Sequence, residues 1–229
     1  MTSKMEDKPR ERATGLKWKV AQWAELRWWK NYLQGKNKKE YYEWKSNYWN
    51  DLLTRIKPHF QVPENKLLVD AGCGPAGIFI VLNETKNKTV AFDPLLDNYQ
   101  DKLAFFEIEE YSNTRFENCG IENFELKEKA DVIFCMNAIN HVSDIHLSYR
   151  NLIQQLKPGG TIVVTIDAHN HSFFKHTFRK LPGDILHPHQ YDLKEYEDFL
   201  TGNGCQIVHE ERIKKEFFFD HYLTVAKKH

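Results

Sequence analysis

The sequence predicts an α/β fold: a mostly parallel seven-stranded sheet with helices on both faces, preceded by an N-terminal helical cap. From Lys66 onward, short apolar runs alternate with amphipathic stretches, a pattern typical of parallel strands covered on both sides. The last two runs, 205–213 and 216–228, follow each other without a helix and indicate an antiparallel pair. Before Pro58 the chain is instead aromatic and helical.

Size and composition favour a single unit. A chain of 229 residues suits one α/β domain, divided into the cap (residues 1–60) and the main domain (61–229). No apolar run approaches the roughly 20 residues that cross a bilayer, and the N-terminus lacks the apolar stretch of a secretory signal. We therefore expect a cytoplasmic protein without a membrane span. The net charge is zero and the basic residues are scattered, so no stable nucleic-acid partner is expected.

The cap is predicted to consist of two aromatic helices, at 17–33 and 38–56, separated by Gly35. All six tryptophans lie in this part of the chain. Their rings can pack the helices against the main domain, or they can wall a substrate pocket. Both interpretations stay open, and Trp28 and Tyr32 are the pocket candidates.

The main domain begins with a short apolar run that ends in a glycine turn, as expected for a buried strand. The expected strands are 66–72, 88–93, 114–120, 130–137 and 160–167. The expected helices are 76–84, 94–106, 143–156 and 191–204. Pro94 suits a helix start, and the segment 157–160 (Lys-Pro-Gly-Gly) is a stop signal after the third of these helices.

The segment 72–77 (Gly-Cys-Gly-Pro-Ala-Gly) turns the first strand sharply and lets a ligand approach the backbone. As G-x-G-x-x-G it is a weak signal for dinucleotide binding. Asp70 precedes it by two residues, and a carboxylate there would oppose a pyrophosphate. A ligand that is cationic at this point suits the segment better.

Five pieces in order resemble the class I S-adenosylmethionine-dependent methyltransferases over residues 66–226. They are the first-strand motif 69–74, the acid Asp93 that ends the second strand, the segment 119–122, the strand end 134–137 and the segment 156–161 before the fifth strand. The resemblance implies a Rossmann-like fold, S-adenosylmethionine as cofactor and methyl transfer as the activity. A final antiparallel strand also belongs to the sheet of that family.

The resemblance also implies roles for particular residues. The methionine end of the cofactor would lie on Asp70 and the glycine backbone, the ribose on Asp93, and the adenine beside Ile121. The full cofactor-binding set is Asp70, Gly72, Cys73, Gly74, Asp93, Pro94, Gly120, Ile121, Glu122, Asn137 and Ala138. Many members carry an aspartate where this chain has Gly120, so the resemblance does not imply the usual contact to the adenine amine.

Groups that act on the acceptor should follow the fourth and fifth strands, because ligands of open α/β sheets bind outside the carboxyl ends of the strands. His141 follows the fourth strand, and it is the candidate general base. His169, His187 and His189 come after the fifth strand and are candidates for the acceptor pocket. This stretch lacks a recognised spacing of metal ligands, so no metal is predicted.

The leading functional hypothesis is a methyltransferase for a small-molecule acceptor with an O, N or S acceptor atom, working as a monomer or homodimer. Two alternatives stay open. One is a methyltransferase of RNA or of a phospholipid head group, which would use the basic, tryptophan-rich N-terminal part. The other is a non-catalytic protein that only binds S-adenosylmethionine.

Overall fold

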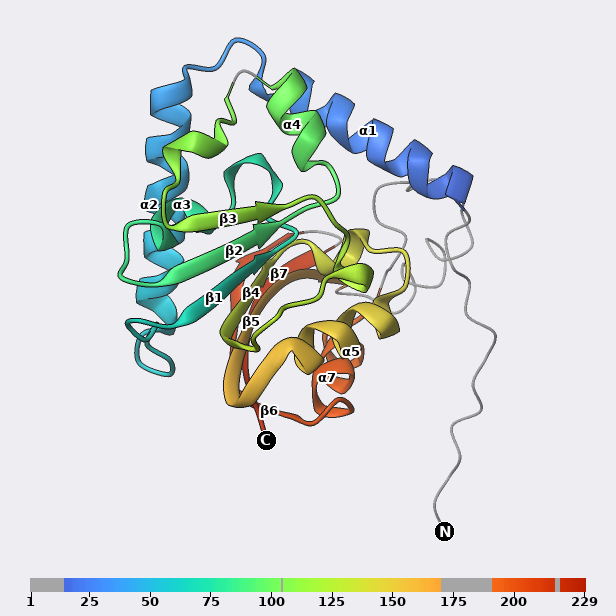
Figure 1. Ribbon diagram of the computed structural model, residues 1–229. Coiled ribbons are helices and arrows are strands. Elements are labelled where there is room, and N and C mark those ends of the chain that lie inside the picture. The colour runs from blue at the N-terminus through green and yellow to red at the C-terminus, as the bar shows by residue number, and fades with distance from the viewer. Residues whose placement is uncertain (1–14, 104, 170–190, 217–218) are drawn as a thin grey trace.

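The computed structural model describes residues 15–103, 105–169, 191–216 and 219–229. Its helices are α1 (Gly15–Leu33), α2 (Lys38–Ile56), α3 (Phe79–Leu82), α4 (Leu96–Lys102), α5 (Ile145–Gln155) and α7 (Leu193–Thr201). Its strands are β1 (Leu67–Ala71), β2 (Lys88–Phe92), β3 (Thr114–Glu117), β4 (Ala130–Met136), β5 (Leu156–His169), β6 (Cys205–Lys215) and β7 (Phe219–Lys228). Each predicted strand and helix of the described residues is present (Figure 1).

The seven strands form one sheet in the order β3-β2-β1-β4-β5-β7-β6. All neighbours from β3 to β5 are parallel, and β7 runs antiparallel to both β5 and β6. The predicted antiparallel pair at the end of the chain is therefore confirmed. β7 is inserted between β5 and β6, which places its residues beside the central strands.

Helices cover both faces of the sheet (Figure 1). On one face α5 and α7 pack on alternate residues of the strands, through a core that includes Tyr149 and Tyr196. On the other face α2 and α3 pack on the intervening strand residues, with Trp49 and Ile56 buried in that contact. Helix α2 thus forms part of the covering layer itself. Helix α1 packs beside α4, where Leu26 is buried in a third cluster.

The segment predicted as a helix over 76–84 is shorter in the structure. It consists of the 3-10 turn η1 (Gly74–Ala76) followed by the four-residue helix α3. Between them Gly77 passes so close to Asp70 that a Cβ at this glycine would lie 2.4 Å from the carboxylate oxygen Oδ2. The chain must therefore wrap around the Asp70 side chain before a helix can begin.

Candidate functional site

A cavity of about 580 Å³ lies at the carboxyl ends of the parallel strands, between the sheet and the helices α1 and α2. The structure brings nearly all the sequence-predicted site residues to it. These are Asp70, Gly72, Cys73, Gly74, Asp93, Pro94, Gly120, Ile121, Glu122, Asn137, Ala138 and His141, together with Trp28. Trp28 comes from α1, Asp70 from β1, and the others from the turns that follow β1, β2, β3 and β4, as the parallel sheet requires.

One predicted residue lies outside this cavity, and three others are not tested by the structure. Tyr32 does not line this cavity; its ring stacks on Trp28, with centroids 4.8 Å apart, and borders a separate hollow. His187 and His189 lie outside the described residues, and so does the side chain of His169.

The glycine turn after β1 is fixed by its own backbone. Gly72 has φ +68°, and the Gly72 and Cys73 N–H groups donate to the carbonyl of Phe92 over 2.8 and 3.0 Å. A Cβ at Gly72 would lie 2.4 Å from the Cβ of Ala138, so the turn passes close against the loop after β4. Only glycine fits a position that combines this φ with this approach.

Asp70 lies almost fully buried under this turn. Its Oδ2 accepts a hydrogen bond of 2.9 Å from the N–H of Phe79, whereas its Oδ1 has no hydrogen-bond partner. Burial raises the pKa of Asp70 to about 7, and the Asp93 charge contributes in the same direction. A buried acceptor without a donor is costly. A cationic or N–H group in the cavity would satisfy it.

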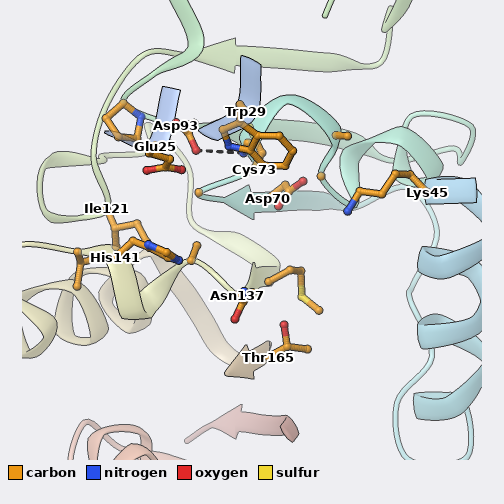
Figure 2. Close-up of a pocket in the computed structure, with 18 of the residues that line it drawn as sticks. Glu25, Trp29, Lys45, Asp70, Cys73, Asp93, Ile121, Asn137, His141 and Thr165 are labelled. Carbon is orange, nitrogen blue, oxygen red and sulfur yellow. Dashed lines mark hydrogen bonds between the residues drawn. The ribbon is translucent and has the colours of Figure 1, made fainter. Parts of the chain in front are cut away.

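Asp93 forms a second acidic point, at the end of β2. Its two oxygens accept from the N–H groups of Leu95 and Gly74, over 2.8 and 3.0 Å. Glu25 of α1 lies next to it (Figure 2). Burial raises the pKa of both carboxyls, and the Asp93 charge raises that of Glu25 further. The sequence analysis missed Glu25, although an acid within an aromatic helical stripe is an unusual signal.

Helix α2 adds a positive charge in an aromatic setting that the sequence analysis also missed. The Lys45 Nζ lies 5.5 Å from the ring centroids of Trp44 and Tyr48, and 4.7 Å from that of Trp49. Burial lowers the pKa of Lys45 to about 8, and the Asp70 charge opposes this shift. Figure 2 shows the ammonium end turned toward Asp70. Lys45 is the one lysine or arginine among the described residues that line the cavity.

The remaining wall comes from β4, β5 and β7. Asn137 follows β4 with φ +52°, a conformation that non-glycine residues rarely adopt. Thr165 of β5 and His221 of β7 lie beyond it. The Nδ1 of His221 is 2.7 Å from the Oδ1 of Asp167. No pattern in the sequence analysis connected His221 to the site, because only the insertion of β7 into the sheet brings it there.

His141 and Glu122 lie on the opposite wall. His141 ends the 3-10 turn η4 (Ile139–His141) and lies beside Ile121 in Figure 2, away from Lys45. The Glu122 Oε1 accepts hydrogen bonds from the N–H and hydroxyl of Ser143, both at 2.7 Å. Glu122 therefore also holds the chain that leads into α5.

Two kinds of feature are absent from the part of the chain that the structure describes. No group of three or more His, Cys, Asp or Glu side chains there could hold a metal ion. None of the helices described is long and apolar enough to cross a membrane.

The model of a family described as "Methyltransferase domain" matches residues 64–203. An O-methyltransferase of ubiquinone biosynthesis from Rickettsia bellii is 27% identical over 116 residues, which are 51% of this chain and 48% of that protein. A tRNA U34 carboxymethyltransferase from Sulfurovum sp. is 31% identical over 124 residues, 53% of this chain and 40% of that protein. Each match thus spans about half or less of the curated relative.

Solved structures share the fold at low sequence identity. The 1,6-didemethyltoxoflavin-N1-methyltransferase of Burkholderia thailandensis, which contains S-adenosylhomocysteine, has a TM-score of 0.58 and 12% identity; the match covers 80% of this chain and 78% of that one. A phosphoethanolamine N-methyltransferase of Haemonchus contortus in complex with S-adenosyl-L-methionine also has a TM-score of 0.58, with 15% identity, covering 79% and 52% of the two chains.

Proposed function

The chain belongs to the class I S-adenosylmethionine-dependent methyltransferases, and from this membership we propose that it transfers the methyl group of that cofactor to a small-molecule acceptor bound in the cavity. The observation that carries the proposal is the distribution of charge along the cavity. Three acids line the cavity on the side of the glycine turn: Glu25, Asp70 and Asp93. Lys45 is the one lysine or arginine of the described lining. S-adenosylmethionine carries a sulfonium, an ammonium and a ribose diol, and no phosphate. Such a ligand fits this acidic wall, whereas a pyrophosphate does not.

The glycine turn and the two aspartates would hold the methionine and ribose parts. The partnerless Oδ1 of Asp70 would accept from the cofactor's cationic end, and the glycine backbone at Gly72, which carries no side chain, would lie along the methionine. A carboxylate has about four lone-pair sites, so Asp93 can still accept from ribose hydroxyls beside its two backbone donors. The backbone carbonyl of Asn137 would accept from the methionine ammonium.

The other predicted residues would enclose the adenine. Ile121 and Ala138 supply apolar surface, with Pro94, Gly120 and Glu122 around them. Trp29 covers the glycine turn next to it: one of its ring carbons is the nearest atom to a Cβ built on Gly74, at 3.5 Å. His141, which the sequence analysis named as a candidate general base, lies on the same wall.

The proposal of a small acceptor rests on the wall that α2 supplies. Trp44, Tyr48 and Trp49 line the cavity there, with Lys45 among them. A cavity of about 580 Å³ is within the range of sites for small molecules. Aromatic walls around one cation suit a compact, partly apolar acceptor better than a polymer.

Calorimetric titration with S-adenosylhomocysteine tests the cofactor site. We expect Asp93→Ala to weaken binding by about 1–3 kcal/mol, the scale of lost charge-assisted hydrogen bonds. Asp101→Ala, which changes an exposed acid outside the cavity, should leave affinity unchanged. Wild-type protein that binds NAD and not S-adenosylhomocysteine would refute the assignment.

A nucleic-acid acceptor is the second candidate, because one relative bears the name of a tRNA-modifying enzyme. The exposed Trp23 on α1 could stack on bases. Binding to tRNA that falls steeply with rising salt would favour this candidate. Methylation of a small molecule in a cell extract, with labelled cofactor and no RNA present, would favour the first and would exclude a non-catalytic role.

A further inference from the structure

The pairing of β5 with β7 places an acid and an imidazole side by side at the cavity. Asp167 and His221 are directly opposite each other in the antiparallel register, so their side chains project from the same face of the sheet. The Nδ1 of His221 lies 2.7 Å from the Oδ1 of Asp167. This distance is that of a strong hydrogen bond to a charged acceptor.

The contact with Asp167 determines which ring nitrogen of His221 is available. A carboxylate only accepts hydrogen bonds, so the neutral imidazole must carry its proton on Nδ1. The Nε2 atom then has the free lone pair. His221 lines the cavity and its side chain is only 17% exposed, which limits competition from bulk water. A carboxylate that orients an imidazole in this way is the arrangement that makes histidine an effective base.

His221 lies on the face of the sheet that α2 covers. Along β7 it is two residues from Leu223, which packs in the cluster beneath α2. Thr165 and Met136 lie next to it on this wall of the cavity, and Tyr48 of α2 is close enough for the Asp167 charge to raise its pKa, after the larger effect of burial. This is the aromatic part of the cavity assigned above to the acceptor. His141, by contrast, lies beside Ile121 on the wall assigned to adenine.

We propose that His221 is the general base of the reaction, that Asp167 is its positioning residue, and that the acceptor atom is therefore the oxygen of a hydroxyl compound. A hydroxyl must lose its proton to become a good nucleophile, whereas a neutral amine or a thiolate can attack without prior loss of a proton. The inference rests on the proposed function of the cavity.

The step balances as follows. The acceptor oxygen forms a bond to the methyl carbon as the carbon–sulfur bond breaks, and the electron pair of that bond remains on sulfur. The hydroxyl proton passes to the Nε2 of His221. The resulting imidazolium is stabilised by the adjacent Asp167 carboxylate, and the methylated oxygen and the thioether leave as neutral groups.

Charged groups face His221 from each element around it. Asp167 lies on β5. Lys214 on β6 is in register with His221, and its Nζ is paired with Glu216. Lys45 and Tyr48 face the same wall from α2.

The first experiment needs no acceptor. Nitrogen-15 NMR of the histidine rings, in wild-type protein with S-adenosylhomocysteine bound, should show neutral His221 protonated at Nδ1. Asp167→Asn should abolish this preference without changing affinity for S-adenosylhomocysteine. A wild-type His221 protonated at Nε2 would overturn the proposal, whatever the activity.

The second experiment measures transfer of labelled methyl groups to the small molecules of a cell extract. We expect His221→Gln to lose roughly 10²–10⁴-fold at pH 7. If the product is a phenol ether, this loss should shrink toward pH 10, where a phenolic hydroxyl ionises by itself. Asp167→Asn should lose less and show a shifted pH profile. His146→Gln, on the exposed surface of α5, is the matched control.

The outcomes separate this proposal from the proposed function. Unchanged activity of His221→Gln, or a pH-dependent loss in His141→Gln instead, would overturn the role of His221 and leave the methyltransferase function intact. Failure of the wild type to bind S-adenosylhomocysteine would refute the proposed function, and the base with it.

Discussion

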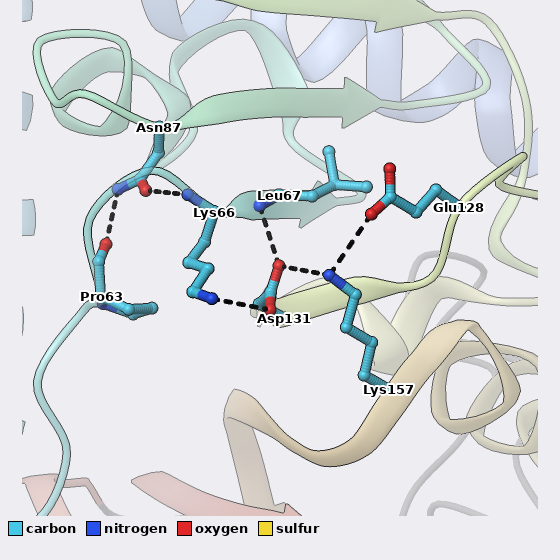
Figure 3. A network of polar contacts seen from close by, with 7 residues as sticks. All are labelled: Pro63, Lys66, Leu67, Asn87, Glu128, Asp131 and Lys157. Atoms are coloured by element: carbon cyan, nitrogen blue, oxygen red, sulfur yellow. Dashed lines mark hydrogen bonds and ion pairs between the residues drawn. The ribbon is translucent and has the colours of Figure 1, made fainter.

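At the amino ends of the parallel strands, the acid Asp131 of β4 is surrounded by donors. Its Oδ2 accepts from the N–H of Leu67 and from the Lys157 Nζ, over 3.0 and 2.9 Å, and the Lys66 Nζ lies 4.0 Å from its Oδ1 (Figure 3). Although burial raises the pKa of Asp131, the hydrogen bonds from Lys157 and Leu67 outweigh it and hold the pKa below the ordinary value.

At the carboxyl ends of the same strands, the acids are buried with too few donors. Asp70 keeps one oxygen without a partner, and Asp93 lies beside another carboxyl, that of Glu25. Burial raises the pKa of all three. At the amino ends of the strands the acid is paired and stabilises the fold. At the carboxyl ends the acids lack partners that a bound ligand can supply. Such strained acids are typical of functional sites.

The glycines of the two edges give the largest predicted contrast. Gly72→Ala would place a Cβ at φ +68° and 2.4 Å from Ala138, so we expect a loss of about 2–4 kcal/mol in the free energy of unfolding. Gly159→Ala at the amino edge has a similar φ of +75°, but its nearest neighbour is the end of Lys227 at 4.0 Å. It should lose only about 1 kcal/mol. Equal losses in denaturant titrations would show that the approach at Gly72 is not tight.

Asp70→Asn should stabilise the protein and weaken its ligand binding. Because the pKa of Asp70 is raised from 3.8 to about 7, the folded state is penalised increasingly as the pH rises through that interval. We expect the variant to gain about 1–2 kcal/mol of stability at pH 8, and nothing below pH 4. Affinity for S-adenosylhomocysteine should fall about tenfold. A variant less stable than wild type at pH 8 would contradict the proposed penalty.

The same substitution at the other edge should have the opposite sign. Asp131→Asn removes a carboxyl whose pKa is lowered in the folded state. This carboxyl stabilises the fold at pH values above its ordinary pKa, and the stabilisation is lost as the pH falls through the lowered pKa. We expect a loss of about 1 kcal/mol at pH 7, shrinking toward pH 3, without any change in ligand affinity. Thermal unfolding at several pH values measures both variants together.

Lys66→Ala should have the smallest effect. Its Nζ is 4.0 Å from Asp131 and its side chain is about half exposed, so we expect a change below about 0.5 kcal/mol. Lys157→Ala removes the shorter contact and should cost more than Lys66→Ala does. If chemical denaturation shows equal losses in the free energy of unfolding for the two variants, contact distance does not determine how much each lysine stabilises the fold.

Sequence patterns were sufficient for the elements and for the cofactor side of the cavity. The family match and the seven-stranded sheet confirm the predicted family and fold. These were predictable because the motif around Gly72 and the acid Asp93 are local signals, placed by consecutive strands and turns. Glu25, Lys45 and His221 have no local signal. They reach the cavity only through the packing of α1 and α2 on the sheet and the insertion of β7, which are long-range contacts.

The position of β7 has a consequence for how the protein folds. β6 has no neighbour in the described sheet other than β7, yet it precedes β7 along the chain. During synthesis, β6 would therefore emerge with nothing to pair with and stay outside the sheet until β7 has been made. The wall that carries His221 is then completed in the same late event that closes the sheet. A partly folded chain would thus present an incomplete cavity, and ligand binding would report on the finished fold.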